Sequence, residues 1–356
     1  MKKQRVIVWF RQDLRLHDNE ALTDAIKSGE EVIPVYVFDE RVFKEKTRFG
    51  FKKTENFRAK FIIESVQDLK KSLQKLGSNL IIRIGKPEEE IFQIARKAKS
   101  SWVFCNRERT EEEVKVQDAL ERNLWAIGQE VRFSRGKMLY YTQDLPFPIT
   151  HCPDVFTSFR KEVEKFVPVR APLPAPTEEF KSLTLDLEEG TIPTLEELGL
   201  EEVVADVRAV LSFKGGESEG LKRLDHYLWQ TDAISKYKET RNGLLGADYS
   251  SKFSLWLAHG CLSPKMIYHE LKRYEEERNN ATANDSTYMM FFELLWRDFF
   301  RFMGKKHGNK IFQIGGTKGD VNRELKNNND LLKLWTDGRT GVPFICLLYT
   351  SPSPRD

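Results

Sequence analysis

Met289-Met-Phe-Phe-Glu-Leu-Leu-Trp-Arg-Asp-Phe-Phe-Arg-Phe-Met303 is the stretch around which the second half of the chain is organised. Large apolar residues occupy nearly every side of this predicted helix, and a helix that is apolar all round is buried. It nevertheless carries charges at i, i+4 and i+8 beside a tryptophan, namely Glu293, Arg297, Arg301 and Trp296. A surface ion pair between Glu293 and Arg297 would explain two of these charges without any function. Because buried charge is unfavourable unless it is paired or used, a functional site is the alternative hypothesis.

A segment rich in glycine and serine precedes this helix in the chain. It reads Arg241-Asn-Gly-Leu-Leu-Gly-Ala-Asp-Tyr-Ser-Ser-Lys-Phe-Ser254, and its glycines permit turns that other residues resist. Ser250 or Ser251 is a suitable N-cap for a helix that runs to His259 and ends at Gly260. Hydroxyls, a lysine and free N–H groups at a helix start favour an anion, usually a phosphate. A serine pair that only caps the helix is the simpler alternative.

The first third of the chain alternates strand-like and helix-like segments. Short apolar runs predict parallel strands, covered on both faces, at residues 6–10, 32–38, 80–84 and 102–105. Helical patterns occur at residues 20–28, 55–76, 87–99 and 111–125. This alternation predicts a doubly wound α/β domain with a parallel sheet over residues 1–135. The first strand is not followed by G-x-G-x-x-G, so the dinucleotide fingerprint is absent.

The remainder of the chain divides into a connector and a helical region. Residues 166–219 are rich in proline, glutamate and glycine, and we assign residues 136–218 to an interdomain connector. From about residue 219 to residue 344 the pattern is helical throughout, which predicts an all-helical second domain. Within it, Ser263-Pro264 predicts a helix start with serine as the cap and proline at the first position.

Composition sets limits on the class of protein. The chain has 356 residues, enough for two domains, and its net charge of +3 gives no global argument for nucleic acid. Four cysteines show neither a C-x-x-C pair nor metal-ligand spacing: Cys105, Cys152, Cys261 and Cys346. We therefore expect no metal site, reduced thiols and a cytoplasmic protein. No apolar run is long enough for a membrane span, and none serves as a signal-peptide core.

Five strings in the second half resemble the cryptochrome/photolyase flavoproteins, in particular the DASH-type cryptochromes. They are Phe213-Lys-Gly-Gly-Glu217, Tyr237-Lys-Glu-Thr-Arg-Asn-Gly243, Ala247-Asp-Tyr-Ser-Ser-Lys-Phe-Ser254, Gly260-Cys-Leu-Ser-Pro264 and Phe292-Glu-Leu-Leu-Trp-Arg-Asp-Phe-Phe300. The resemblance covers roughly residues 5–344. It implies an α/β antenna domain, an all-helical domain that binds flavin adenine dinucleotide (FAD), and a monomer. It also implies photolyase activity, in which light drives an electron from reduced flavin to a cyclobutane pyrimidine dimer in single-stranded DNA and back.

The resemblance also assigns roles to individual residues. Those that match the site of the flavin diphosphate are Tyr237, Ser250, Ser251, Lys252, Phe253 and Ser254. Arg297 is expected to be a buried cation between the flavin and its helix, and Arg241 matches a contact to DNA phosphate. Glu293 and Trp296 match the substrate pocket, where a flipped base needs a polar partner for its edge and an aromatic plane for stacking.

An acidic helix start follows the fourth predicted strand, where ligands of doubly wound sheets bind. It reads Asn106-Arg-Glu-Arg-Thr-Glu-Glu-Glu113, and attraction between carboxylates and the helix dipole explains most of these glutamates without a ligand. The resemblance implies that a folate antenna, 5,10-methenyltetrahydrofolate, binds near this turn. Glu113 matches the carboxylate that contacts the antenna, and Glu112 matches more loosely.

The end of the chain departs from the family. Residues 335–344 still match, whereas residues 345–356 are expected to be a foreign tail from translated cloning or adapter DNA. On this interpretation the helical domain is incomplete, and we expect the chain as given not to hold flavin tightly. Leu325 stands where the family's tryptophan relay is expected to have its outermost member. The source of electrons for reducing the flavin therefore stays open.

Two other functions fit the same sequence. A blue-light photoreceptor that regulates partners or DNA, without significant repair, would share the fold and the flavin residues. Retention of Glu293 together with Trp296 favours repair. A generic nucleotide-binding α/β domain with a helical appendage is a weaker alternative, and it predicts no flavin.

Overall fold

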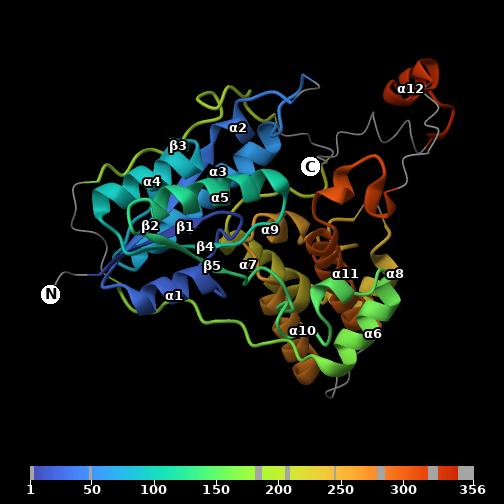
Figure 1. The fold of residues 1–356 in the computed structure, drawn as a ribbon. Coiled ribbons are helices and arrows are strands. Elements are labelled where there is room, and N and C mark those ends of the chain that lie inside the picture. The colour runs from blue at the N-terminus through green and yellow to red at the C-terminus, as the bar shows by residue number, and fades with distance from the viewer. Residues whose placement is uncertain are drawn as a thin grey trace.

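The computed structural model describes residues 4–47, 50–180, 187–204, 209–243, 246–278, 285–319 and 328–343. Figure 1 shows a sheet flanked by helices in the first part of the chain and a group of helices beside it. The described residues include no helix with the length and apolar character that a membrane crossing requires. The predictions for Leu325 and for residues 345–356 fall outside the described residues.

A five-stranded parallel sheet forms the centre of the first part. Its strands are β1 (Arg5–Phe10), β2 (Glu31–Asp39), β3 (Ile81–Gly85), β4 (Trp102–Asn106) and β5 (Glu130–Ser134). They are ordered β3-β2-β1-β4-β5, which confirms the doubly wound prediction. The strand order reverses between β1 and β4, and ligands of such sheets bind at this switch point. Strand β5 is absent from the sequence prediction because Glu130 and Arg132 interrupt its apolar run.

Helices cover both faces of this sheet (Figure 1). They are α1 (Glu20–Ser28) and α3 (Asn56–Lys75) on one side, and α4 (Pro87–Ala98) and α5 (Glu111–Trp125) on the other. A short helix, α2 (Glu40–Phe43), follows β2. Alternate residues of β1 enter two separate cores, as the geometry of a strand requires. Val6, Val8 and Phe10 pack in the core of α1 and α3, whereas Ile7 and Trp9 pack with α4 and α5.

The second part of the structure is helical, as predicted. Its helices are α6 (Phe156–Phe166), α7 (Glu217–Asp225), α8 (Tyr237–Thr240), α9 (Ser254–Ala258), α10 (Pro264–Arg278), α11 (Asp285–His307) and α12 (Asn329–Thr336). Single helical turns lie at Ile149–His151, His226–Gln230, Ala233–Lys236, Gly308–Phe312 and Gly316–Lys318. The described residues between α6 and α7 form neither helix nor strand, in keeping with their proline- and glycine-rich composition.

Helices α10 and α11 follow the sequence predictions closely. The Ser263 hydroxyl accepts hydrogen bonds from the backbone N–H of Lys265 at 3.2 Å and of Met266 at 3.5 Å, which confirms it as a cap. Helix α11 contains the whole predicted segment and extends it at both ends. It is not buried on every side, because the side chain of Phe300 is 63% exposed.

The predicted start of α9 is wrong. The helix begins at Ser254 and has no side-chain cap, so neither Ser250 nor Ser251 is its N-cap. Lys252 has a φ of 57°, a left-handed conformation that a continuous helix does not allow. The guanidinium of Arg223 instead binds the carbonyl oxygens of Ser250 at 3.2 Å and Ser251 at 3.0 Å. These contacts hold the segment before α9 as a loop.

The loop after β1 joins the two parts of the molecule. Its Arg15 side chain is fully buried and donates to the carbonyl oxygens of four residues at 2.8–3.0 Å: His17, Asp18, Gly136 and Gly260. Gly260 lies so close to the loop that an added Cβ would be 2.2 Å from the carbonyl oxygen of Gln12. Gly260 also has a φ of 69°, so glycine is required here on both counts.

Two carboxylates complete this joint. Asp18 forms an ion pair with Lys265 on α10 at 2.8 Å, and both side chains are at most 2% exposed. Asp18 also accepts a hydrogen bond from the Ser263 hydroxyl. Glu217, at the start of α7, accepts hydrogen bonds from the backbone N–H groups of Leu16 at 2.7 Å and His17 at 3.0 Å. The sequence Leu14–Asn19 therefore belongs to the interface between the two parts rather than to a solvated loop.

Replacing Lys265 with Met should lower the free energy of unfolding by about 3–5 kcal/mol, because it leaves the buried Asp18 carboxylate without its cation. Replacing Lys222 with Met is the matched control: among the described contacts this exposed lysine pairs with Glu219, and its loss should have a much smaller effect. Urea unfolding of the two variants and the wild type measures both changes. Equal effects of the two substitutions would contradict a buried interdomain ion pair.

Candidate functional site

The polar side of α11 does not form the simple ion pair that helical spacing suggested. Among the described contacts, Glu293 pairs with Arg241 at the end of α8 and not with Arg297. Arg297 donates to the carbonyl oxygens of Lys137 at 2.9 Å and Leu257 at 3.3 Å. The i, i+4 alternative is therefore wrong, and each charge on α11 contacts a different segment of the fold.

Burial shifts the pKa values of Arg297 and Asp298 on α11. Burial, followed by repulsion from Arg301, lowers the pKa of Arg297 to about 10, so its guanidinium stays charged at neutral pH. Burial also raises the pKa of Asp298 to about 6, against the opposing effect of Arg297. One oxygen of Asp298 accepts a hydrogen bond from the backbone N–H of Tyr140 at 2.9 Å. Asp298 therefore fixes the chain after β5 against α11.

Trp296 lies within an aromatic stack. Its ring is parallel to that of Phe156, with centroids 3.6 Å apart, and it also stacks on Phe300 at 5.4 Å. Phe156 is buried, whereas Phe300 is largely exposed. One face of the tryptophan is thus covered from α6, and access to the other depends on the position of Phe300.

The segment predicted to bind phosphate is positively charged. Arg223 is anchored by Asp248 at 2.6 Å and holds the backbone of this segment. The Lys252 ammonium contacts the Ser250 hydroxyl at 3.3 Å, and within the described residues it has no ion-pair partner. Burial, followed by repulsion from Arg223, lowers the pKa of Lys252. An anion placed beside Ser250 and Lys252 would offset this repulsion. The charge at this position therefore fits a diphosphate group.

Buried aromatic rings connect this segment to the end of α8. The ring of Tyr227 lies 5.9 Å from that of Phe253 and 6.4 Å from that of Tyr237. Burial, followed by the Glu293 charge, raises the pKa of Tyr237, and Arg241 opposes this effect. The structure thus brings together Tyr237, Arg241 and Glu293, with Phe253 one ring away. Sequence reasoning missed Tyr227 and Arg223, because nothing in their local sequence distinguishes them from ordinary helix residues.

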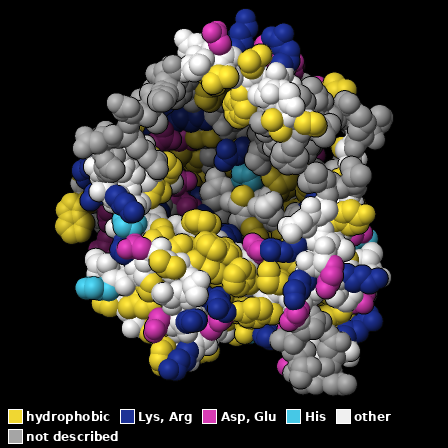
Figure 2. Space-filling view, turned by 90° about the vertical axis from the view of Figure 1, so that its right-hand side faces the viewer, with side chains coloured by type: hydrophobic (Ala, Val, Ile, Leu, Met, Phe, Trp, Pro, Cys, Tyr) yellow, Lys and Arg dark blue, Asp and Glu magenta, His cyan; other side chains and the backbone are white. Residues whose placement is uncertain are grey.

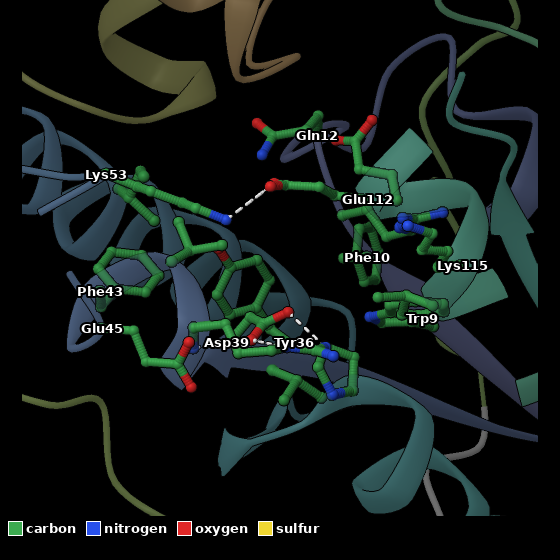
Figure 3. A pocket seen from close by; sticks show the side chains of 18 of the residues that line it. Trp9, Phe10, Gln12, Tyr36, Asp39, Phe43, Glu45, Lys53, Glu112 and Lys115 are labelled. Carbon is green, nitrogen blue, oxygen red and sulfur yellow. Dashed lines mark hydrogen bonds and ion pairs between the residues drawn. The ribbon is translucent and has the colours of Figure 1, made fainter. Parts of the chain in front are cut away.

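The first cavity of interest lies at the carboxyl ends of β1 and β2 (Figure 3) and has a volume of about 320 Å³. Trp9, Tyr36 and Phe43 supply aromatic walls, and Lys53 reaches across its mouth to the carboxylate of Glu112 at 2.8 Å. Asp39 is held by Arg41, which also binds Glu88. The volume and mixed lining are typical of a site for a small organic ligand.

A second cavity, of about 390 Å³, lies between the α/β part and α11. Its lining includes Glu113 and Arg109 from one part and Phe300, Arg301 and Phe312 from the other. Figure 2 shows that the α11 side of the molecule is hollowed, with basic side chains inside the hollow.

Glu113 lines both cavities, from the first turn of α5. Its carboxylate accepts a hydrogen bond from the Thr110 hydroxyl at 2.7 Å, which fixes its position at the helix start. Glu112 faces the first cavity and not the second. The expected antenna residue therefore lies at a wall shared by two ligand-sized spaces.

The described residues contain no group of three or more histidine, cysteine, aspartate or glutamate side chains arranged to hold a metal ion. Three of the cysteines, Cys105, Cys152 and Cys261, are buried free thiols. Burial raises the pKa of Cys105 to about 12 and the pKa values of the other two to about 11. These thiols therefore stay protonated at neutral pH.

Comparison with known proteins places this architecture in one family. The model of the DNA photolyase family matches residues 6–177. The chain is 46% identical over 345 residues to a cryptochrome DASH from Gloeobacter violaceus, a match that covers 97% of this chain and 68% of that protein. It is 44% identical to cryptochrome DASH from Xenopus laevis, covering 96% of this chain and 64% of that protein.

Solved structures agree with the sequence matches. The crystal structure of a Synechocystis cryptochrome superposes with a TM-score of 0.92 at 45% identity, covering 98% of this chain and 71% of that one. An archaeal photolyase from Sulfolobus tokodaii superposes with a TM-score of 0.71 at 25% identity, covering 96% of this chain and 69% of that one. The chain therefore belongs to the cryptochrome/photolyase family, among its DASH-type members. It spans roughly two thirds of the length of these relatives.

His259, at the end of α9, should make the stability of the protein depend on pH. It is buried, its Nδ1–H donates to the side-chain oxygen of Gln12 at 2.9 Å, and burial with the nearby Arg58 and Lys137 lowers its pKa to about 3. The unfolded chain binds a proton at this residue near pH 6.5, whereas the folded chain does not. The unfolded state therefore gains protons below pH 6.5, and stability falls as the pH falls.

Replacing His259 with Gln, which retains a polar partner for Gln12, should remove this contribution. Between pH 6.5 and pH 4.5, wild-type stability should fall more steeply than that of the variant, by about 1.4 kcal/mol per pH unit. Chemical unfolding at a series of pH values measures the difference in slope. Parallel pH profiles for the two proteins would show that His259 is protonated in the folded state.

Proposed function

We propose that this protein is a flavin-dependent, light-driven DASH-type cryptochrome with photolyase activity on cyclobutane pyrimidine dimers in single-stranded DNA. The observation that carries the proposal is the ion pair between Arg241, which follows α8, and Glu293 on α11, one helical turn before Trp296. These residues provide a cation for DNA phosphate, a polar group for a base edge and an aromatic plane. The solved photolyase from Sulfolobus tokodaii contains FAD, which supports FAD as the cofactor here.

The residues present fit a flavin nucleotide. Ser250, Ser251 and Ser254 with Lys252 would hold its diphosphate, because the Lys252 cation has no acidic partner among the described residues. Phe253 would contribute its backbone, and Tyr237 would pack nearby. Arg297 stays charged in its buried position and would face the flavin from α11. When bound, the flavin supplies the light-excited electron; the protein has only to bind it, orient it and exclude water.

Glu293 and Arg241 then act on the DNA. Arg241 exchanges its ion pair with Glu293 for a contact to a DNA phosphate, which leaves Glu293 able to bind the edge of a flipped pyrimidine. Extrusion of the damaged bases costs less from a single strand than from a duplex, because fewer pairing and stacking interactions are lost. A compact site with one carboxylate and one aromatic plane suits the single-stranded substrate.

An antenna chromophore is the second expected ligand, and we propose 5,10-methenyltetrahydrofolate held by Glu113. Two cavities, of about 320 and 390 Å³, offer room for it, and Glu113 lines both. The cavity beside α11 is the better choice because it lies between the α/β part and the helices that carry the flavin residues. The Sulfolobus tokodaii protein, whose second FAD implies a different light-harvesting cofactor, shows that the antenna varies among relatives.

A blue-light photoreceptor without significant repair is the second candidate function, and one observation favours it. Phe156 covers one face of Trp296 and Phe300 stacks against it as well, so no open plane awaits a base. Repair requires Phe300 to move, which its exposure permits. A photoreceptor would keep the stack intact. Loss of dimers from an irradiated single-stranded oligonucleotide distinguishes the two functions.

We further propose that the protein acts as a monomer in the cytoplasm. Buried free thiols at Cys105, Cys152 and Cys261 support a reducing compartment.

Replacing Glu293 with Ala should slow light-dependent dimer loss by roughly 100-fold, because the base edge loses its polar partner. The test uses a chimera in which the remaining third of the Gloeobacter violaceus relative follows residue 343, with repair normalised to bound flavin. Glu276, an exposed glutamate on α10, provides the control variant Glu276→Ala. Reduced flavin content with unchanged repair per flavin would make Glu293 a structural residue.

In the same chimera, replacing Glu113 with Ala should abolish the near-ultraviolet absorbance of bound folate and leave the flavin band unchanged, since the flavin residues lie elsewhere. Glu121→Ala, an exposed change on the same helix, is the control. Lys53→Ala alters only the first cavity and Phe312→Ala only the second, so a loss of folate in one of them identifies the cavity that is used. Full folate binding by Glu113→Ala would refute the assignment.

A further inference from the structure

Six cations gather where the end of β5 meets α11, around a narrow space of about 20 Å³: Arg107, Arg109, Arg135, Lys137, Arg301 and Lys305. One carboxylate, Glu108, compensates two of them. It is in contact with Lys137 and lies 3.9 Å from Arg301. The other four cations, Arg107, Arg109, Arg135 and Lys305, are called the basic cluster here. Within the described part of the chain, none of the four has an acidic side chain at ion-pair distance.

Two members of the basic cluster, Arg107 and Lys305, contact neutral groups. Arg107 lies over the ring of Phe133 at 5.0 Å, and the Lys305 ammonium donates to the Thr142 hydroxyl at 3.0 Å. Burial, followed by repulsion from the three arginines of the cluster, lowers the pKa of Lys305 to about 8. The fold therefore holds like charges together without compensation, an arrangement that proteins retain mainly at functional sites.

The narrow space lies beside larger ones and shares wall residues with them. It shares Arg109, Lys137 and Arg301 with the second cavity, beside Glu113. On the other side it shares Arg135 and Tyr141 with a space of about 220 Å³ that is also lined by Arg170. A ligand in the second cavity therefore lies beside the basic cluster, and an extension of that ligand can reach these cations along the walls that the spaces share.

We propose that the basic cluster binds a flexible polyanionic chain attached to the ligand of the second cavity. Arginine binds carboxylate and phosphate groups through paired hydrogen bonds, so γ-linked glutamyl carboxylates and phosphates share the chemistry that this cluster recognises. The glutamyl source rests on the proposed folate antenna, whereas the anion site itself does not. A DNA strand is a poorer occupant, because the narrow space has no room for bases.

The first experiment measures the affinity of the 356-residue chain for 5,10-methenyltetrahydrofolate with one and with three glutamyl groups. The wild type should bind the triglutamate at least about tenfold more tightly, since two or more charge-assisted hydrogen bonds are added. The double variant Arg135→Gln/Lys305→Gln should bind both forms equally. Lys86→Gln/Lys222→Gln removes the same charge from two exposed lysines, each paired with one glutamate, and should keep the preference.

Tripolyphosphate, compared with sodium chloride at equal ionic strength, tests the phosphate source and does not depend on folate. It should bind the wild type and raise its unfolding temperature, but have no effect on Arg135→Gln/Lys305→Gln. Without any ligand, that double variant should be at least as stable as the wild type, because repulsion within the cluster is relieved. This comparison shows that a loss of binding is not a loss of folding.

Three results would overturn the basic cluster as an anion site. The first is equal binding of both folates together with no binding of tripolyphosphate, and the second is an unchanged preference for the triglutamate in the double variant. The third is a double variant that loses affinity only for a single-stranded oligonucleotide. Binding of tripolyphosphate by the wild type alone, with no folate binding at all, would support the anion site and refute the folate antenna. The failures of the two proposals are therefore distinguishable.

Discussion

The buried contacts of the loop after β1 are the constraint on which the rest of the structure depends. Arg15 binds four carbonyl oxygens from both parts of the molecule, and Asp18 binds Lys265 at 2.8 Å away from water. Charged groups buried to this extent tolerate little displacement, because each lost contact leaves an uncompensated charge. They therefore fix α10 against the sheet, and with it the distance between Glu113 and α11 across the second cavity.

The two sides of helix α11 have different roles. Met290, Leu294 and Phe302 are buried in the core and secure the helix. The other side carries Glu293 and Arg297, whose partners lie on α8, on the chain after β5 and at α9. A helix that is held so firmly on one side can present charges on the other in fixed positions.

Much of this fold follows from local sequence, whereas the joint and the exact site do not. Continuous apolar runs predict β1 to β4, and Ser263-Pro264 predicts the start of α10, because these signals are complete within a few residues. The start of α9 is mispredicted because Arg223, some 30 residues earlier, holds the backbone of Ser250 and Ser251. Similarly, the charges at residues 11–19 look like a solvated loop until the helices that bury them are in place. Spacing along one helix likewise could not reveal that Glu293 pairs with Arg241.

The two proposed ligand sites can be recognised from their local charge but not from the net charge of the chain. A total of +3 suggests no anionic partner, yet Lys252 and the basic cluster both lack acidic partners among the described residues. Exposed lysines elsewhere in the described structure often pair with a glutamate three or four residues away, as Lys86, Lys115 and Lys222 do. These lysines are compensated locally, whereas Lys252 and the basic cluster are not. Because concave, partly buried cations attract anions more strongly than exposed ones do, both sites are suited to phosphate or carboxylate groups on ligands rather than to the protein's own side chains.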